Sequence, residues 1–246
     1  ALEKGYKPEY LEKTGLVKIK SNSSGKQELP TTGYQPAFAE RSTASAGRLP
    51  THNYYDGFRG RVMFPIHNLS GRVIGFGGRV LKKDEKTAKY INTPECDIYH
   101  KSKTLYGIYF AKKAIIEKDN CYLVEGYTDV ISLHQSGIEN SVASSGTSLT
   151  QEQIRLIGRY TRNITILYDG DSSGIKASFR GIDMILEEGM NVRAALFPDG
   201  EDPDSFSKKV SDSELAKFIS DNSKDFIVFK TNLLKKETEN DPIKKT

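Results

Sequence analysis

The sequence contains no tryptophan, only two cysteines and no long apolar run. Cys96 and Cys121 lack CxxC spacing, which argues against a zinc site or a disulfide scaffold and favours free thiols in a reducing compartment. No stretch reaches the roughly 20 apolar residues of a membrane-spanning helix, and no basic-then-apolar leader opens the chain. We therefore expect a soluble, cytoplasmic protein. Because the chain begins at Ala1 instead of Met, we also expect a fragment or a processed chain.

Charge is unevenly distributed along the 246 residues, although the net charge is only +4. Residues 1–118 contain 21 Lys and Arg against 11 Asp and Glu, whereas residues 119–246 contain 15 against 21. A basic half attracts polyanions, and an acidic half gathers cations. With 37% hydrophobic and 28% charged residues, the chain is otherwise typical of a globular protein with one large domain or two subdomains.

The first half of the chain predicts a mixed α+β subdomain. Its patterns indicate a short helix near 8–13, a long loop over 21–53 and a hairpin formed by residues 61–66 and 72–76. Residues 82–104 are polar and predict irregular structure. Apolar residues at helical spacing then predict a helix over 105–117.

After residue 120 the pattern becomes regular and predicts an α/β fold. The expected strands are residues 121–124, 141–143, 163–168 and 192–197. The expected helices are residues 129–135, a segment opened by a capping box at Thr150, residues 175–188 and a charged tail from 213. This alternation predicts a parallel sheet covered by helices on both faces. We divide the chain into 1–118, 119–206 and a C-terminal helical segment, 207–246.

Carboxylates follow three of the four expected strands, at the edge where ligands bind in open parallel sheets. They are Glu125 and Asp129, Asp169 and Asp171, and Asp202 and Asp204. Each pair alone is typical of a solvated turn, but together they would repel one another without a cation. Oxygen ligands without His or Cys favour Mg²⁺ or Mn²⁺ over zinc. Such metals serve phosphoryl and nucleotidyl transfer.

Glycines at positions 75, 77 and 78 superficially suggest a phosphate-binding loop. They lie in the expected hairpin, whereas a dinucleotide-binding fingerprint needs a strand, a Gly-rich turn and a helix. We assign these glycines to close approach of the backbone. No GxxxxGK[ST] motif is present, so the sequence gives no sign of a P-loop ATPase.

Two motifs at the strand ends resemble the Toprim module of primases, topoisomerases and some nucleases. They are residues 125–129 (Glu-Gly-Tyr-Thr-Asp) and 168–174 (Tyr-Asp-Gly-Asp-Ser-Ser-Gly). Further segments resemble the bacterial DnaG-type primases: residues 61–66, 75–79, 89–95, 100–101, 105–107, 143–147 and 200–204. The resemblance is close over about residues 54–206 and looser in the flanks.

This resemblance implies an RNA polymerase that makes short primers on single-stranded DNA. Glu125, Asp169 and Asp171 match the catalytic, metal-binding carboxylates, and Glu125 also matches a position suited to proton transfer. Asp129, Asp202 and Asp204 match further acidic positions that support metal binding. The positions matching the template- and nucleotide-binding surface are Arg59, Arg61, Arg79, Lys89, Tyr90, Asn92 and Lys101. Tyr90 is equally suited to stacking on a base and to packing.

The resemblance also implies partners. They are a single-stranded DNA template, NTPs and the RNA primer, with no membrane. A replicative helicase and a zinc-binding domain are expected through regions outside this chain, which itself contains no zinc ligands. We expect a monomeric fragment that acts at the replication fork in the bacterial nucleoid.

Two other classes of protein remain open. A Toprim nuclease or topoisomerase would share the carboxylates but cleave DNA strands; a topoisomerase would also need a nucleophilic tyrosine in a further domain. A non-catalytic module that binds single strands would keep the fold alone, and the retained Glu125, Asp169 and Asp171 argue against it.

Overall fold

The computed structural model describes residues 7–19, 54–82, 87–146, 148–170 and 181–231. The chain forms two compact units, residues 1–60 and 61–246. The predicted loop over 21–53 lies outside the described residues.

The first unit contains a small helix and a two-stranded sheet. Its elements are α1 (Pro8–Lys13), β1 (Val17–Ile19) and β2 (Tyr54–Asp56). Pro8 lies in the first turn of α1, where a missing N–H costs nothing, so the predicted helix at 8–13 is confirmed. β1 and β2 pair in antiparallel fashion.

The second unit begins with a three-stranded antiparallel sheet in the order β3-β4-β5. Its strands are β3 (Arg61–His67), β4 (Val73–Val80) and β5 (Tyr90–Asn92). The predicted hairpin is confirmed. The prediction that 82–104 is irregular is wrong at β5, because these residues pair with β4 at Gly77, Gly78 and Arg79. A strand of three residues is too short to show a period and depends on its neighbour.

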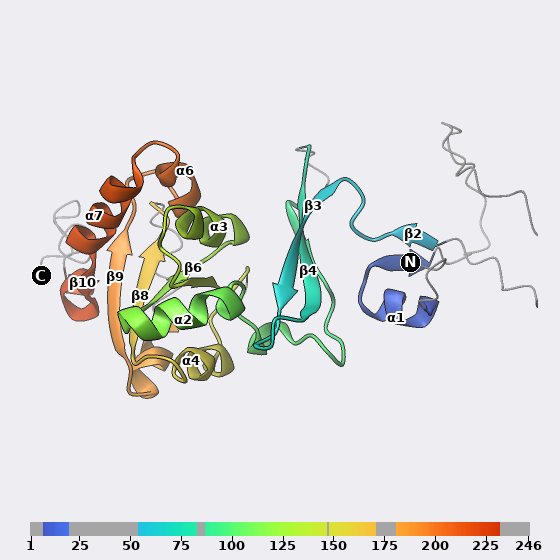
Figure 1. Ribbon diagram of the computed structural model, residues 1–246, viewed down its shortest axis with the longest axis horizontal. Coiled ribbons are helices and arrows are strands. Elements are labelled where there is room, and N and C mark those ends of the chain that lie inside the picture. Colours follow the sequence, from blue (N-terminus) through green and yellow to red (C-terminus); the bar gives the residue numbers. More distant parts are fainter. Residues whose placement is uncertain (1–6, 20–53, 83–86, 147, 171–180, 232–246) are drawn as a thin grey trace, which may run out of the picture. The chain divides into compact units, whose positions relative to one another are not determined.

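A five-stranded sheet forms the rest of the second unit, in the order β10-β9-β8-β6-β7 (Figure 1). Its strands are β6 (Cys121–Val124), β7 (Ser141–Ala143), β8 (Asn163–Tyr168), β9 (Asn191–Leu196) and β10 (Lys224–Asp225). The first four are parallel, as predicted. The two-residue β10, which the sequence did not predict, joins the edge in antiparallel fashion.

Helices cover both faces of this sheet. They are α2 (Ile108–Lys118), α3 (Tyr127–Gln135), α4 (Gln151–Ile157), α6 (Pro203–Ser207), α7 (Asp212–Asn222) and helical residues at 181–187 and 226–231, with a 3₁₀ turn η2 (Lys101–Lys103). One apolar cluster joins α2, α4 and the two unlabelled helices to one face. A second joins α3 and α7 to the other face. Along β8, Ile164 and Ile166 belong to the first cluster and Leu167 to the second, as alternating side chains require.

Capping side chains fix where the helices begin. Thr150 accepts a hydrogen bond from the Gln153 N–H at 3.2 Å and its own N–H donates to the Gln153 side chain, which confirms the predicted capping box. The predicted helix at 129–135 begins two residues earlier, because Asp129 accepts from the N–H of Gly126. In the described residues, helix length and apolar content fall short of what crossing a bilayer requires.

Candidate active site

Glu125 and Asp169 lie at one edge of the five-stranded sheet. Glu125 directly follows β6 and Asp169 directly follows β8. These strands are parallel neighbours, with Cys121 opposite Ile164 and Leu123 opposite Ile166, so their carboxyl ends meet at the same edge. Glu125 is exposed and Asp169 half-buried. Asp171, the third predicted catalytic carboxylate, lies outside the described residues.

The turn after β8 is pressed against the loop that follows β9. The Gly170 N–H donates to the Glu201 carbonyl at 2.8 Å. A Cβ at Gly170 would lie only 1.9 Å from the Pro198 carbonyl oxygen. The φ of Gly170 is outside the left-handed region. Glycine is required here by the close approach of a second backbone segment.

The other acidic residues connect α3 with α6. Asp129 Oδ2 accepts from the Gly126 N–H at 2.9 Å, and Asp202 caps α6 by accepting from the Ser205 N–H at 2.6 Å. Asp204 accepts from the Ser132 hydroxyl at 2.5 Å and pairs with Lys208 at 2.8 Å. Asp129, Asp202 and Asp204, which were predicted to support metal binding, therefore stabilise the backbone next to Glu125 and the start of α6 after β9.

Burial shapes the ionisation of this acidic group. Burial, followed by the charge of Asp202, raises the pKa of Asp129 to about 6. Burial would also raise the pKa of Asp204, but Lys208 and the Ser132 hydroxyl outweigh it and hold that pKa below its ordinary value. In the part of the chain that the structure describes, no three His, Cys, Asp or Glu side chains group closely enough to hold a metal ion. Glu125 and Asp169 supply two oxygen donors of the predicted set.

Asp129 should make the metal-free protein less stable as the pH rises. Its pKa is about 6 in the fold against an ordinary 3.8, so the stability from proton binding is complete below 3.8 and is lost as the pH rises through 6. Asp129→Asn should remove this decline, worth about 2–3 kcal/mol. Thermal unfolding with a chelator, from about pH 4 to pH 7, measures it. Asp183→Asn on the exposed face of helix 181–187 is the control; an unchanged pH profile in Asp129→Asn would contradict the prediction.

Basic and aromatic side chains of the three-stranded sheet gather around Tyr90. The Arg79 guanidinium and the Lys89 ammonium each lie 5.8 Å from the centre of the Tyr90 ring. The π-face of the ring attracts both cations. Arg79 also lies close enough to Asp204 to lower its pKa. The structure thus brings these three predicted nucleotide-binding residues together beside the acidic group.

The remaining predicted binding residues have different surroundings. The Arg61 guanidinium donates to the carbonyls of Gly78, Ala88 and Lys89 at 2.8–3.3 Å and so fastens the segment before β5 to the sheet. Lys101 Nζ donates to the Gly146 carbonyl at 3.4 Å. Arg59 belongs to the first compact unit and is exposed.

Tyr127 is a residue of the site for which sequence reasoning gave no role, although it lies within the motif at 125–129. Its side chain is 2% exposed and lies in an aromatic cluster of the three-stranded sheet. Its hydroxyl lies 2.7 Å from the Asn92 side chain. A Cβ at Gly77 would come within 2.6 Å of its ring, which confirms close approach as the reason for this glycine. Burial raises the pKa of Tyr127 to about 12.

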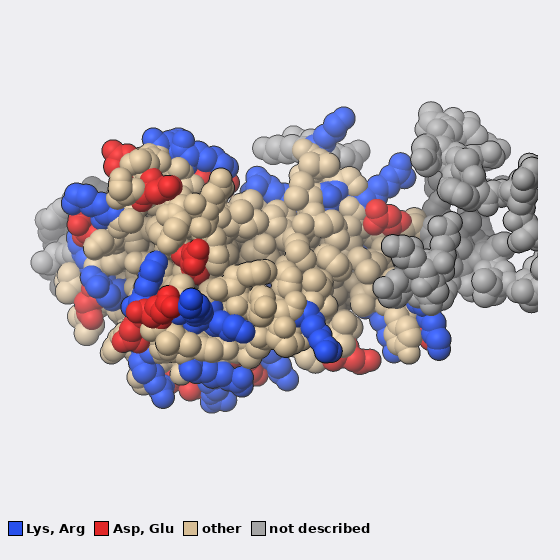
Figure 2. Space-filling model, viewed as in Figure 1, with Lys and Arg blue, Asp and Glu red and all other residues tan. Residues whose placement is uncertain are grey.

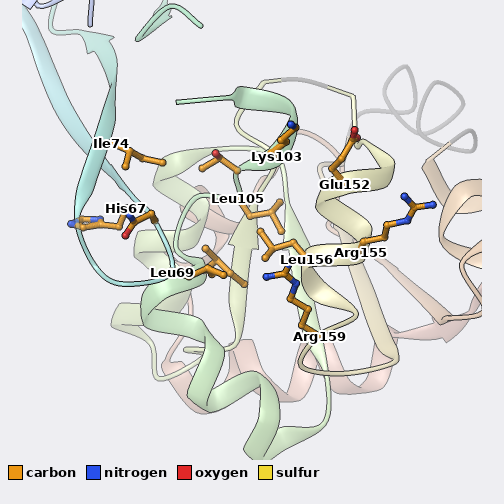
Figure 3. Close-up of a pocket in the computed structure, with 12 residues that line it drawn as sticks. His67, Leu69, Ile74, Lys103, Leu105, Glu152, Arg155, Leu156 and Arg159 are labelled. Atoms are coloured by element: carbon orange, nitrogen blue, oxygen red, sulfur yellow. The ribbon is translucent and has the colours of Figure 1, made fainter. Parts of the chain in front are cut away.

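A cavity of about 360 Å³ lies away from these residues, between the β3–β4 turn and α4 (Figure 3). Leu105 and Leu156 form its apolar centre, His67 and Leu69 border it on the hairpin, and Arg159 reaches in from the helical side. None of the described residues that line it belongs to the predicted site. On the face that Figure 2 shows, Lys and Arg lie at the borders of the three-stranded sheet, and both signs of charge mix over the five-stranded sheet.

Two family models match the chain. A model of the DNA primase catalytic core, N-terminal domain, matches residues 2–112. A Toprim-like model matches residues 122–207. Together they cover the three-stranded sheet, the parallel strands of the five-stranded sheet apart from Cys121, and all of the predicted site residues.

The curated proteins that the chain resembles are DNA primases, in agreement with the first family model. A DNA primase of Clostridium acetobutylicum is 47% identical over 174 residues, which are 70% of this chain and 29% of that protein. A DNA primase of Escherichia coli K12 is 47% identical over 175 residues, 69% of this chain and 30% of that protein. The chain therefore spans about a third of the length of the curated relatives it matches.

Solved structures extend the likeness to the fold. A DNA primase domain of Pseudomonas aeruginosa matches with a TM-score of 0.74 at 34% identity, over 93% of this chain and 63% of that one. The E. coli primase catalytic core matches with a TM-score of 0.71 at 37% identity, over 94% and 65%. A DnaG primase catalytic domain bound to single-stranded DNA matches at 0.69 and 36%, over 90% and 63%. With both segments and the fold in agreement, the chain belongs to the bacterial DnaG-type primases and corresponds to part of their catalytic core.

Proposed function

We propose that this chain is the catalytic part of a DNA primase, which joins ribonucleotides into short RNA primers on single-stranded DNA. One observation carries the proposal. Glu125 and Asp169 leave neighbouring parallel strands at the same edge, and Tyr127, two residues beyond Glu125, packs into the sheet that bears the basic residues. Carboxylates for a metal and cations for phosphates thus belong to one folded unit.

Glu125, Asp169 and Asp171 would hold Mg²⁺ or Mn²⁺, since their donors are all oxygens. The metal, when bound, would neutralise charge on the α-phosphate and the pyrophosphate leaving group. Glu125 is exposed and is suited to receive the proton of the primer 3′ hydroxyl. Asp129, Asp202 and Asp204 would act mainly by fixing α3 and α6 around these ligands, with a further metal or its waters as a second role.

Arg79, Lys89 and Lys101 would bind phosphates of the NTP or the template, and we assign Arg59, in the first unit, the same kind of role. Phosphate contacts do not read base sequence, as suits a template of arbitrary sequence. Tyr90, flanked by two cations, would offer its ring to a base. The carbonyl contacts of Arg61 support a role in shaping this surface.

The partners follow from the relatives. A DnaG catalytic domain of 36% identity has been solved with single-stranded DNA. A structure of the Aquifex aeolicus primase, 40% identical, contains zinc-binding and RNA polymerase domains. We propose that the same kind of domain, and the contact with a replicative helicase, belong to other parts of the polypeptide, which works in the bacterial cytoplasm at the fork.

A priming assay tests the proposal. The full chain, single-stranded DNA, labelled NTPs and MgCl₂ or MnCl₂ should yield short RNA that disappears when template is omitted or metal is chelated. Nicking of supercoiled DNA without NTPs would instead indicate a Toprim nuclease. Binding of single strands that ignores both metal and NTPs would indicate a non-catalytic module. Either result in place of RNA synthesis would overturn the proposal.

A further inference from the structure

The proposed reaction requires a fixed distance between the three-stranded sheet and the five-stranded sheet. Asn92 belongs to β5 of the three-stranded sheet, and Lys101 follows in η2 of the same region. Glu125 follows β6 of the five-stranded sheet. A misplacement of about 1 Å between reacting groups lowers a rate by about 100-fold. Something must therefore fix β5 relative to the turn at Glu125.

The Tyr127 ring crosses between the two sheets. It stacks on Phe64 of β3 with ring centres 5.1 Å apart and an angle of 12°, and it meets Tyr106 edge-to-face at 4.7 Å and 89°. Tyr127 itself begins α3, immediately after the turn at Glu125 and Gly126. Its ring thus packs against the three-stranded sheet, whereas its backbone lies in α3, which packs on the five-stranded sheet.

The hydroxyl at the end of this ring has a partner on β5. It lies 2.7 Å from the Asn92 side-chain amide. With the amide nitrogen facing Tyr127, that nitrogen also donates to the Ile91 carbonyl at 3.1 Å, and the amide oxygen accepts from Lys101 Nζ at 3.3 Å. Tyr127, Asn92 and Lys101 then form one chain of hydrogen bonds through two residues of the proposed nucleotide-binding surface.

The turn after β7 holds the backbone of Glu125 in place. Ser145 has a φ of 60°, the left-handed region that a non-glycine residue rarely adopts, and it is 8% exposed. Its N–H donates to the Glu125 carbonyl at 3.2 Å. A strained, buried residue thus fixes the backbone of Glu125, two residues before Tyr127.

We propose that Tyr127 is a positioning residue, whose hydroxyl sets β5 and its nucleotide-binding side chains relative to Glu125. This inference rests on the proposed function, since the distance between β5 and Glu125 affects activity only if a nucleotide binds at this edge of the sheet. The ring packing supplies stability, and the hydroxyl sets the position of Asn92 relative to the turn at Glu125. The hydroxyl does not touch the reacting atoms.

Tyr127→Phe separates the two roles, because it keeps the ring and removes only the hydroxyl. We expect KM for NTPs to rise about five- to tenfold, the equivalent of one lost hydrogen bond, with kcat and the metal concentration for half-maximal activity changed less than about twofold. The melting temperature should fall by less than about 4 °C. Tyr106→Phe is the matched control, since the Tyr106 hydroxyl forms no hydrogen bond with a described residue; its KM should not change.

A double-mutant cycle with Asn92→Ala tests whether the two side chains act together. If they do, Asn92→Ala should raise KM less in the Tyr127→Phe background than in the wild type. An unchanged KM in Tyr127→Phe, or fully additive effects, would overturn the proposal. A change confined to the metal dependence would also overturn it, because the hydroxyl would then act on the carboxylates.

Binding of a fluorescent ATP analogue with MnCl₂ to the full chain keeps this inference separate from the proposed function. A wild type that binds the analogue but makes no primers would contradict primer synthesis. Tyr127→Phe should still weaken binding about five- to tenfold in that case. Equal affinity of wild type and variant would overturn the positioning role, as would a wild type that binds no nucleotide.

Discussion

Asp169→Asn is expected to abolish primer synthesis, with a loss of at least about 100-fold, because substitutions that only support a metal ligand already cost about 10–100-fold. Asn preserves the shape of the side chain and removes its charge. Asp169 follows the central strand β8, directly beside the end of β6 where Glu125 lies. A neutral amide there would leave the metal with one anionic ligand fewer on this edge.

The substitution should spare the fold and the binding of template. Removing a negative charge from an acidic edge reduces repulsion between Asp169 and its neighbours. No cation of the proposed nucleic-acid surface is altered, so the affinity for single-stranded DNA should stay the same or increase slightly. Priming activity, melting temperature and DNA affinity, measured on the same preparation, distinguish a lost metal ligand from a lost fold.

Two further variants make this test sharper. Glu125→Gln changes an exposed side chain at the neighbouring strand end and should cause a similar loss of synthesis with an unchanged melting temperature. Asp221→Asn makes the same chemical change on α7, where the carboxylate forms an exposed i,i+4 pair with Lys217, and it should be fully active. Undiminished synthesis by Asp169→Asn would refute the metal assignment.

The sequence predicts much of the parallel sheet because its strands are buried on both faces. Residues 163–168, for example, are mostly apolar, are buried at every position except Asn163, and have the length of a strand. Glu125 and Asp169 could be placed at one edge for the same reason, since each directly follows such a run. The partners of Asp204, which follows β9, could not be predicted in this way, because one of them, Ser132, lies on α3, 72 residues earlier in the sequence.

The contacts between strands, and those between the two sheets, could not be predicted from the sequence. Arg79 and Lys89 flank one ring only because β4 and β5 pair in a particular register. Tyr127 is 35 residues from Asn92, and no local pattern indicates their hydrogen bond. The short strand β5 was missed for the same physical reason: its stability comes from its partners and not from its own residues.

The second large effect is expected from Gly170→Ala. The new Cβ would lie 1.9 Å from the Pro198 carbonyl oxygen, 2.6 Å from its carbonyl carbon and 3.0 Å from the Asp199 Cα. All three are backbone atoms, which cannot turn aside as a flexible side chain can. The turn after β8 must therefore separate from the loop after β9 and strain or break the hydrogen bond from Gly170 to Glu201.

We expect this collision to cost stability and activity together. Overpacking costs about 3 kcal/mol at a site that cannot relax, which corresponds to a fall in melting temperature of about 6–12 °C for a chain of this size. Synthesis should fall more than about tenfold even well below that temperature, since Asp169 moves with the turn. Differential scanning calorimetry and the priming assay, run on one sample, measure both.

Gly181→Ala provides the matched control for this prediction. Gly181 is helical, and a Cβ there would meet the Leu149 side chain at an ordinary 3.5 Å. The same substitution should therefore leave activity intact and raise stability by up to about 1 kcal/mol, because alanine favours a helix over glycine. If Gly170→Ala behaved like Gly181→Ala, the two loops would not be in the contact that fixes Asp169. In that case β8 alone would determine the position of the Asp169 carboxylate, and a shift of Asp202 would leave that position unchanged.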